Sequence, residues 1–258
     1  MRGLREAIKR LSRRVKFAIK CRGQEVIRIR ARKLSLIVIF AAVGVVCDAM
    51  VTHEFSAGVW FGGVFMISPI VGIVLGPYDG FVSTLIAVMI GHCLVPRETI
   101  YEFIFTLGAP TGSMMSGFVY RGDWKKVFAF YTTMLVFYFM APVSWYLPIW
   151  GMWDVFVAYV ILLALGVVVS ARGSDEINHL SPFAVSAFIG LEADILLRIF
   201  ILVPCQTYQL FYRLTPEALV AIWSVPAPLI TPFKVLLSTF TATLITPQIV
   251  RVLKMSKA

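Results

Sequence analysis

Three ionisable side chains lie close together near the middle of a long apolar stretch, residues 181–204. Charges inside such a stretch are costly in a membrane and usually mark a functional site or a buried pair. Asp194 and Arg198 are four residues apart, so on a helix they share a face and can form an ion pair. Glu192 points about 200° away from Asp194. It is therefore interpreted either as a protonated group in an interhelical hydrogen bond or as part of a polar substrate cavity.

Two further charged residues could line the same cavity. Lys234 lies in the last apolar stretch, where it could reach the membrane surface or neutralise Glu192. Glu102 lies four residues after Glu98, so both share a helix face. That face is expected at the membrane surface or around an outer mouth of the cavity.

Motifs for metal binding and for several common catalytic mechanisms are missing from the sequence. There is no HExxH, GxSxG or Walker GxxxxGK[ST] motif, and the four cysteines show no CxxC spacing. Asp48 is expected at the membrane interface, and His92, which is isolated, is expected to be a packing residue. We predict no catalytic residue, no metal and no cofactor. An ATP-driven process would need a separate ATPase subunit.

The composition indicates that most of the chain lies in lipid. Of its 258 residues, 59% are hydrophobic and 15% are charged, whereas ordinary globular chains carry about 25% charged residues. A helix needs roughly 20 apolar residues to cross the hydrocarbon core, and it satisfies its backbone polar groups internally. We predict an all-α integral membrane protein, a bundle of six to eight transmembrane helices. The eight apolar segments are 34–51, 60–75, 81–95, 101–120, 127–148, 153–171, 181–204 and 228–250.

The basic residues are concentrated at the N-terminus. Residues 1–33 hold 13 of the 24 Lys and Arg residues and only 2 of the 14 acidic residues. Within them, residues 4–19 repeat apolar side chains at three- and four-residue steps, which predicts a basic amphipathic helix. We expect this arm to bind anionic lipid, or alternatively to dock a partner, and to precede one transmembrane domain at 34–258. Because the positive charge belongs to the arm, nucleic-acid binding is not predicted.

The distribution of all the Lys and Arg residues, those of the arm included, indicates how the chain crosses the membrane. If the chain starts inside and crosses eight times, the inner stretches carry 20 Lys and Arg residues and the outer loops carry two. This asymmetry satisfies the positive-inside rule. We therefore predict a multi-pass protein of the cell membrane with both termini in the cytoplasm.

Two local patterns predict how particular helices meet. The second and third apolar segments are joined only by the sequence GPYDG at 76–80. Gly76 can end a helix in the left-handed conformation, Pro77 cannot continue one, and Asp79 can cap the next. A tight helical hairpin is expected, whose spans could be re-entrant rather than complete. Small residues also fill 108–113, where close helix packing is expected.

Three stretches carry short motifs whose order along the chain is informative. They are IVGIVLGPYDG at 70–80, GFVYRGDWKK at 117–126 and the last apolar segment from Thr231 to Pro247. In this order they resemble the LGP-x-x-G hairpin, the exit of the fourth span and the last helix of S components, the substrate-binding subunits of energy-coupling-factor transporters. The resemblance covers residues 34–126 and 228–250.

The resemblance implies a subunit that captures a vitamin or a metal ion from outside and associates with a membrane coupling subunit and two ATPases. Of these ligands we expect a small vitamin-like solute. In that family the first helix presents small side chains to the coupling subunit. Ala41, Val45 and Ala49 fall at the matching spacing and are the predicted docking residues. The candidate substrate contacts are Glu192, Asp194, Arg198, Lys234 and Glu102.

Two other functions are compatible with the same residues. An intramembrane enzyme acting on a lipid or prenyl substrate would use Glu192 and Asp194 as acid–base or metal-binding groups. A membrane scaffold would use the basic arm to recruit a partner. An enzyme should turn over alone, whereas an ATPase-coupled transporter should co-purify with other subunits.

Overall fold

The computed structural model describes most of the chain after the basic arm. The described residues are 31–50, 54–56, 59–61, 63–95, 102–172 and 182–255. The predicted amphipathic helix at 4–19 lies outside the described residues, and so does Glu98.

Helices make up nearly all of the described elements, and each predicted apolar segment overlaps one of them. The first described helix is Ala31–Met50. The others are α2 (Val64–Leu75), α3 (Pro77–Leu94), α4 (Glu102–Phe105), α5 (Gly108–Tyr120), α6 (Trp124–Met140), α7 (Trp153–Arg172), α8 (Pro182–Leu202), α9 (Thr207–Leu210), α10 (Pro216–Ser224) and α11 (Pro226–Met255). The remaining elements are two 3-10 helices, η1 (Pro142–Tyr146) and η2 (Ile149–Met152), and two strands, β1 (Glu54–Ser56) and β2 (Val59–Phe61).

The helices and their surface identify a membrane-embedded protein. Four described helical stretches are long and apolar enough to cross a membrane: Ala31–Met50, Pro77–Leu94, Ile149–Ala171 and Pro226–Leu253. Large apolar side chains cover the outside of the bundle, as Val167 does on α7 and Phe240 on α11. Lipid solvates such a surface, whereas in water it would be an aggregation hazard.

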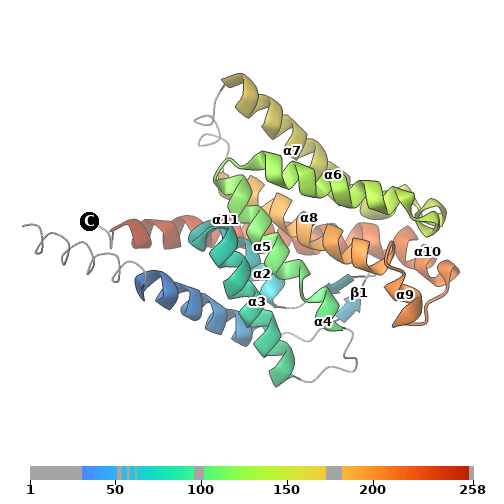
Figure 1. Ribbon diagram of the computed structural model, residues 1–258, viewed down its shortest axis with the longest axis horizontal. Coiled ribbons are helices and arrows are strands. Elements are labelled where there is room, and N and C mark those ends of the chain that lie inside the picture. The colour runs from blue at the N-terminus through green and yellow to red at the C-terminus, as the bar shows by residue number, and fades with distance from the viewer. Residues whose placement is uncertain are drawn as a thin grey trace, which may run out of the picture.

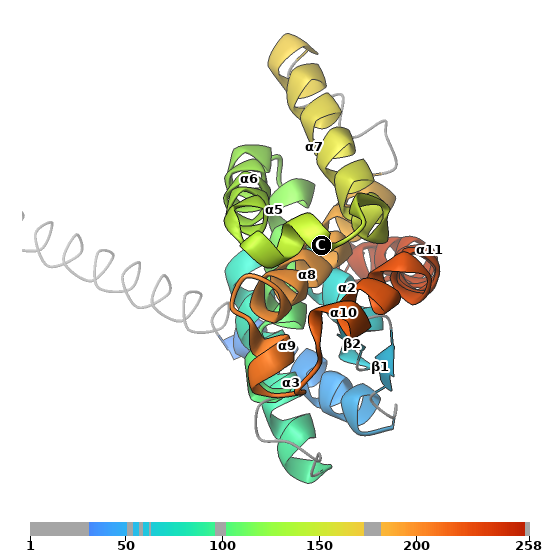
Figure 2. The ribbon, with the colours of Figure 1, turned by 90° about the vertical axis from the view of Figure 1, so that its right-hand side faces the viewer.

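Helix α8 forms the centre of the bundle. Its residues are buried around the whole circumference, including Ile189, Leu191, Ala193 and Ile195. Figure 2 shows α8 in the middle, with α5 and α6 to its left, α11 to its right and α7 above it. Because α8 is enclosed on all sides, solvent does not compensate its ionisable residues, and each of them needs a protein partner, a proton or a ligand.

Small residues let α5 approach α8 closely, as the sequence predicted. A Cβ atom on Gly112 of α5 would lie 2.8 Å from the Gly190 carbonyl oxygen. A Cβ on Gly190 would in turn clash with Oγ of Ser116. Small side chains bring helix backbones together in membranes. This contact therefore fixes where the polar residues of α8 stand relative to α5.

The predicted hairpin between α2 and α3 is present, with two local differences. Gly76 ends α2 with φ of 95° and ψ of 172°, and its N–H donates to the Gly72 carbonyl oxygen. It has the positive φ that favours glycine, but not the left-handed helical conformation that was expected. Pro77 begins α3 directly, so Gly76 occupies the capping position and Asp79 falls in the first turn. The Asp79 carboxylate instead pairs with Nζ of Lys33 at 2.6 Å.

Basic residues gather at one end of the bundle. Arg32 donates a hydrogen bond to the Leu253 carbonyl oxygen near the end of α11, at 3.4 Å. Arg121, just after α5, donates to the Leu75 carbonyl oxygen at the end of α2, also at 3.4 Å. The start of the first described helix, the α2–α3 turn and the ends of α5 and α11 therefore meet. Figure 1 shows α9 and α10 at the opposite end, to the right, and the red end of α11 to the left.

Three stretches differ from the predicted pattern. Segment 127–148 is not one helix, because α6 ends at Met140 and Pro142 and Pro148 introduce the 3-10 helices η1 and η2. The stretch 205–227, which separates the last two predicted apolar segments, contains α9 and α10. Strands β1 and β2 pair antiparallel and form a small hairpin that the sequence did not predict.

Candidate functional site

The predicted ion pair between Asp194 and Arg198 is present in the structure. Nε of Arg198 donates to Oδ1 of Asp194 at 2.5 Å, and Nη2 donates to Oδ2 at 3.4 Å. Both side chains are buried. Gly108 of α5 lies directly against the pair, where any Cβ would clash with the Asp194 carboxylate. The charge of Asp194 is therefore balanced within α8, at the surface where α8 meets α5.

Glu192 faces away from that pair, as its position on the helix predicted. It is fully buried, with 0% of the residue exposed, and neither carboxylate oxygen has a hydrogen-bond partner among the described residues. Its electrostatic neighbours are Asp154 on α7 and Tyr131 on α6. The interhelical hydrogen bond considered for Glu192 is therefore absent from the described part of the chain.

Asp154 is a second buried acid, which the sequence did not single out. It lies in the first turn of α7 and is 3% exposed. Its Oδ1 accepts a hydrogen bond from the backbone N–H of Val155 at 3.0 Å. Its Oδ2 has no hydrogen-bond partner in the part of the chain that the structure describes. An acid at the start of an apolar segment is usually expected at the membrane surface, so only tertiary packing reveals that this one is covered.

Two buried aromatic side chains, one on α6 and one on α10, pack against neighbouring elements. Tyr131 joins α6 to α8, because its hydroxyl donates to the Ile189 carbonyl oxygen at 2.7 Å. Trp223 of α10 is buried against η2, where a Cβ on Gly151 would clash with its indole ring. Its Nε1 has no hydrogen-bond partner among the described residues, although the Tyr138 side chain lies close to it.

We call Asp154, Glu192 and Tyr131 together the acidic cluster. It draws one residue each from α7, α8 and α6. Two of its members are carboxyl groups with unpartnered oxygens, as far as the described residues go. Chemically, such a cluster can accept hydrogen bonds, hold protons or neutralise a positive charge.

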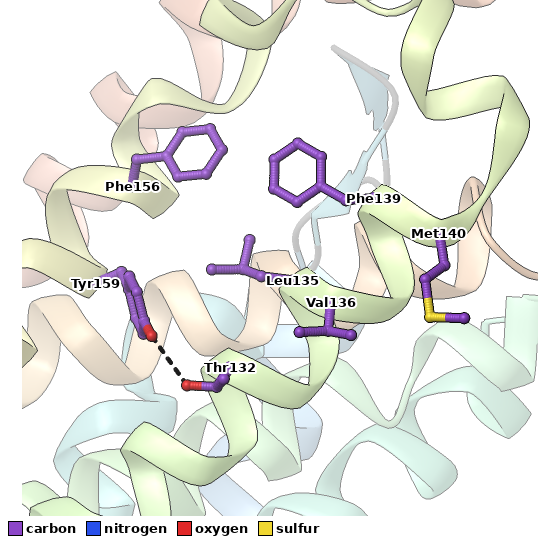
Figure 3. A pocket seen from close by; sticks show the side chains of 7 residues that line it. All are labelled: Thr132, Leu135, Val136, Phe139, Met140, Phe156 and Tyr159. Carbon is purple, nitrogen blue, oxygen red and sulfur yellow. Dashed lines mark hydrogen bonds between the residues drawn. The ribbon is translucent and has the colours of Figure 1, made fainter.

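A groove of about 500 Å³ lies between α6 and α7 (Figure 3). The side chains that line it are Thr132, Leu135, Val136, Phe139, Met140, Phe156 and Tyr159. The hydroxyls of Thr132 and Tyr159 hydrogen-bond to each other at 2.9 Å, and the other five linings are apolar. The Tyr159 ring also stacks on Tyr131, with ring centroids 6.1 Å apart. The groove therefore adjoins the acidic cluster through this pair of rings.

A second buried polar pair joins the first described helix to α3. Oδ2 of Asp48 lies 3.2 Å from Nδ1 of His92, and that nitrogen also lies 2.8 Å from the Val88 carbonyl oxygen. Asp48 is 2% exposed, and a Cβ on Gly91 would clash with its carboxylate. Asp48 therefore contacts a neighbouring helix, which the sequence did not predict, whereas His92 is a buried packing residue, as expected. The cause is the close approach of two helices, which spacing along one helix does not reveal.

The residues predicted to dock a partner lie on the first described helix. Ala41 is 5% exposed, whereas Val45 and Ala49 are half-buried. This side of the helix partly packs within the chain, because a Cβ on Gly44 would lie 2.5 Å from Cβ of Ala87 on α3. A docking role for Ala41, Val45 and Ala49 stays a prediction.

A role in substrate binding for the other two residues, Lys234 and Glu102, stays a prediction. Lys234 is half-buried on α11 and has an interaction partner, but it does not hydrogen-bond to Glu192. Glu102 begins α4, and its side chain lies outside the described part of the chain. Among the described residues, no three His, Cys, Asp or Glu side chains gather as a metal site would require.

Comparisons with known proteins do not assign a function to this chain. No protein-family model, curated protein or solved structure matches the chain. The function therefore has to follow from what Glu192, Asp154 and their neighbours can bind.

Proposed function

We propose that this chain is the substrate-capture subunit of a transporter and binds a small vitamin-like solute within its helical bundle, as S components of energy-coupling-factor transporters do. The observation that carries the proposal is Glu192. It is fully buried on the central helix, and its carboxylate oxygens have no hydrogen-bond partner among the described residues. A carboxylate in such a position is costly unless a partner compensates it. An acid without a structural partner at the centre of the bundle supports a ligand contact.

Asp194 and Arg198 have a different role in this proposal. They satisfy each other through two hydrogen bonds and lie against Gly108 of α5. The pair fixes the rotation of α8 about its axis, which turns Glu192 toward α6 and α7. Asp194 and Arg198 therefore position the contact residue, and Glu192 binds the solute.

The proposed membrane arrangement has six to eight crossings and both termini in the cytoplasm. It is supported by the basic end of the bundle, where Arg32, Lys33 and Arg121 gather around the α2–α3 turn. By the positive-inside rule this end faces the cytoplasm. The range of six to eight reflects α2 and α5, whose 12 and 13 residues are fewer than the roughly 20 that cross a bilayer.

The proposed partners are a membrane coupling subunit, ATPase subunits and anionic lipid. A coupling subunit would reach the first described helix near Val45 and Ala49, which are half-buried. Anionic lipid would bind the arm and its last residues. A cavity of about 280 Å³ at the basic end supports the lipid contact, because Arg32 and Arg121 line it together with the apolar Val74 and other aliphatic side chains.

The geometry disfavours an intramembrane enzyme that uses Glu192 and Asp194 together. Asp194 is bound to Arg198 at the α5 contact, whereas Glu192 lies near Asp154 and Tyr131. The two carboxylates therefore do not converge on one substrate atom, as an acid–base pair must.

Mass spectrometry of bound small molecules tests the proposal. Protein purified in mild detergent from its native membrane should carry a tightly bound solute, and Glu192→Gln protein purified in parallel should carry much less of it. Glu217→Gln on α10 is the matched control, because Glu217 is an exposed acid, and it should keep the solute. Equal loading of the wild type and Glu192→Gln would end the case for Glu192 as the contact. Sustained turnover of a lipid by the purified chain alone would favour an enzyme instead.

A further inference from the structure

We propose that the captured solute is an organic cation, held by Asp154 and Glu192 together. This inference rests on the proposed function and goes beyond it by naming the charge of the solute. The site would lie between α6, α7 and α8, at the acidic cluster. Asp154 contributes as much to this site as Glu192 does, although the sequence did not single it out.

The charge balance of the cluster is the first argument. Three oxygens of two buried carboxyl groups, both of Glu192 and Oδ2 of Asp154, have no hydrogen-bond partner among the described residues. The described cation nearest along α8, Arg198, is bonded to Asp194 at the α5 contact and faces the other way. Two carboxyl groups so enclosed must hold protons or meet a positive charge. A cation that replaces those protons turns an unfavourable pair into a binding site.

The neighbouring rings are the second argument. Tyr131 lies within electrostatic range of both acids, and it stacks on Tyr159 of the groove. Aromatic faces attract alkylammonium groups, and the attraction strengthens where water is excluded. The groove beyond these rings has a volume of about 500 Å³, and the Phe139 and Phe156 rings stack within it. It offers the apolar part of the solute a place beside the Tyr159 ring, which Figure 3 shows among the lining side chains and which stacks on Tyr131 of the acidic cluster.

Other classes of ligand fit the cluster less well. An anion would add a third negative charge to two carboxyl groups in a low-dielectric interior. A divalent metal normally takes three or more protein ligands, and among the described residues no third His, Cys, Asp or Glu joins the two acids. A neutral solute would leave the pair without a counter-charge. An organic cation uses the carboxylates and the rings at once.

Paired probes that differ only in charge provide the test. Purified full-length protein in detergent would be titrated with choline and with its neutral isostere 3,3-dimethyl-1-butanol. A second pair, benzyltrimethylammonium and neopentylbenzene, adds a ring that the groove can hold. At least one ammonium probe should raise the thermal unfolding temperature well above the shift from its isostere. The inference is overturned if neither ammonium probe exceeds its neutral partner.

Variants locate the effect at the two acids. Asp154→Asn and Glu192→Gln should each weaken binding of the active ammonium probe by at least about tenfold, because each removes one negative charge that attracts the cation in a low-dielectric site. Glu217→Gln should bind the probe as the wild type does. Folding is checked by size-exclusion chromatography and circular dichroism. If a variant does not fold, the comparison of charged and neutral probes on the wild type still decides. Unchanged affinity in both folded variants would overturn the assigned site.

The two proposals can fail separately. If a neutral or anionic solute co-purifies and is lost in Glu192→Gln, the capture function stands and the cation assignment is wrong. If no solute co-purifies and no ammonium probe exceeds its isostere, both are wrong. A cationic solute lost from both Asp154→Asn and Glu192→Gln supports both.

Discussion

The buried carboxylate of Asp194 is the counter-charge of Arg198, so its loss should weaken the fold. Asp194→Asn leaves the guanidinium buried beside a neutral amide. Removing one partner of a buried ion pair typically costs about 3–5 kcal/mol. We expect the free energy of unfolding to fall by about that amount, measured by denaturant titration in mixed micelles with circular dichroism as the signal.

An exposed ion pair in the same chain serves as the control for that substitution. Nζ of Lys126 lies 3.1 Å from Oδ2 of Asp123, and about half of each side chain is exposed. Exposed pairs contribute about 0–1 kcal/mol, so Asp123→Asn should change the free energy of unfolding by no more than this. Equal effects of Asp194→Asn and Asp123→Asn would contradict a structural role for the buried pair.

Substitution of Glu192 should have the opposite profile, with folding retained and solute binding lost. Glu192→Gln removes an acid without a described hydrogen-bond partner, so the thermal unfolding temperature of empty protein should stay the same or rise. Affinity for the solute should fall by about 1.5–3 kcal/mol, the range for hydrogen bonds to charged groups. Both are measured on one preparation, by thermal unfolding and by ligand titration. A large fall in stability would indicate a structural partner for Glu192.

At this scale the sequence predicts what one helix determines and misses what two helices determine. Spacing by four residues predicts the Asp194–Arg198 pair, and helix geometry predicts that Glu192 faces elsewhere. Asp154 and the contact between Asp48 and His92 depend on which helices become neighbours. No spacing within one segment contains that information.

The position of Glu192 depends on the contact between helices α5 and α8. A Cβ on Gly190 would clash with Oγ of Ser116, so Gly190→Ala should push the two helices apart. Overpacking of a close contact typically costs about 1–3 kcal/mol. We expect a lower thermal unfolding temperature and weaker solute binding together, measured in the same detergent. Ala42→Leu, at an exposed position of the first described helix, is the control and should change neither.

Element boundaries follow from the sequence wherever local chemistry decides them. The Gly76–Pro77 turn is predicted because proline begins a helix more readily than it continues one. The end of α6 near Met140 was missed because the apolar run continues through Pro142 and Pro148. The prediction gave too much weight to the hydropathy of that run and too little to its two prolines. The short α10 was missed for the opposite reason, since it lies in a stretch that interrupts the apolar pattern.

At the scale of the whole molecule, the apolar segments predict the helices, and the structure shows which helix ends meet. The structure brings Arg121 to the same end as Arg32 and Lys33, although Arg121 is far from them along the chain. The enclosure of α8 and the cover that α10 places over η2 are properties of the assembled bundle. The enclosure of α8 leaves Glu192 buried without a hydrogen-bond partner among the described residues, so the acidic cluster could be recognised only after folding.

Labelling of single cysteines in intact cells tests the proposed orientation. Cys205 is exposed in the connection between α8 and α9. Because α9 lies at the end opposite the basic residues (Figure 1), Cys205 should react with a membrane-impermeant maleimide when it is the only cysteine. Burial raises the pKa of its thiol, so mildly alkaline buffer is needed to form the thiolate. Lys125→Cys, exposed at the start of α6 near Arg121, should react only after permeabilisation. Cysteines placed at positions 2 and 257 should behave like Lys125→Cys. Labelling of these inner sites in sealed cells, with Cys205 protected, would reverse the orientation.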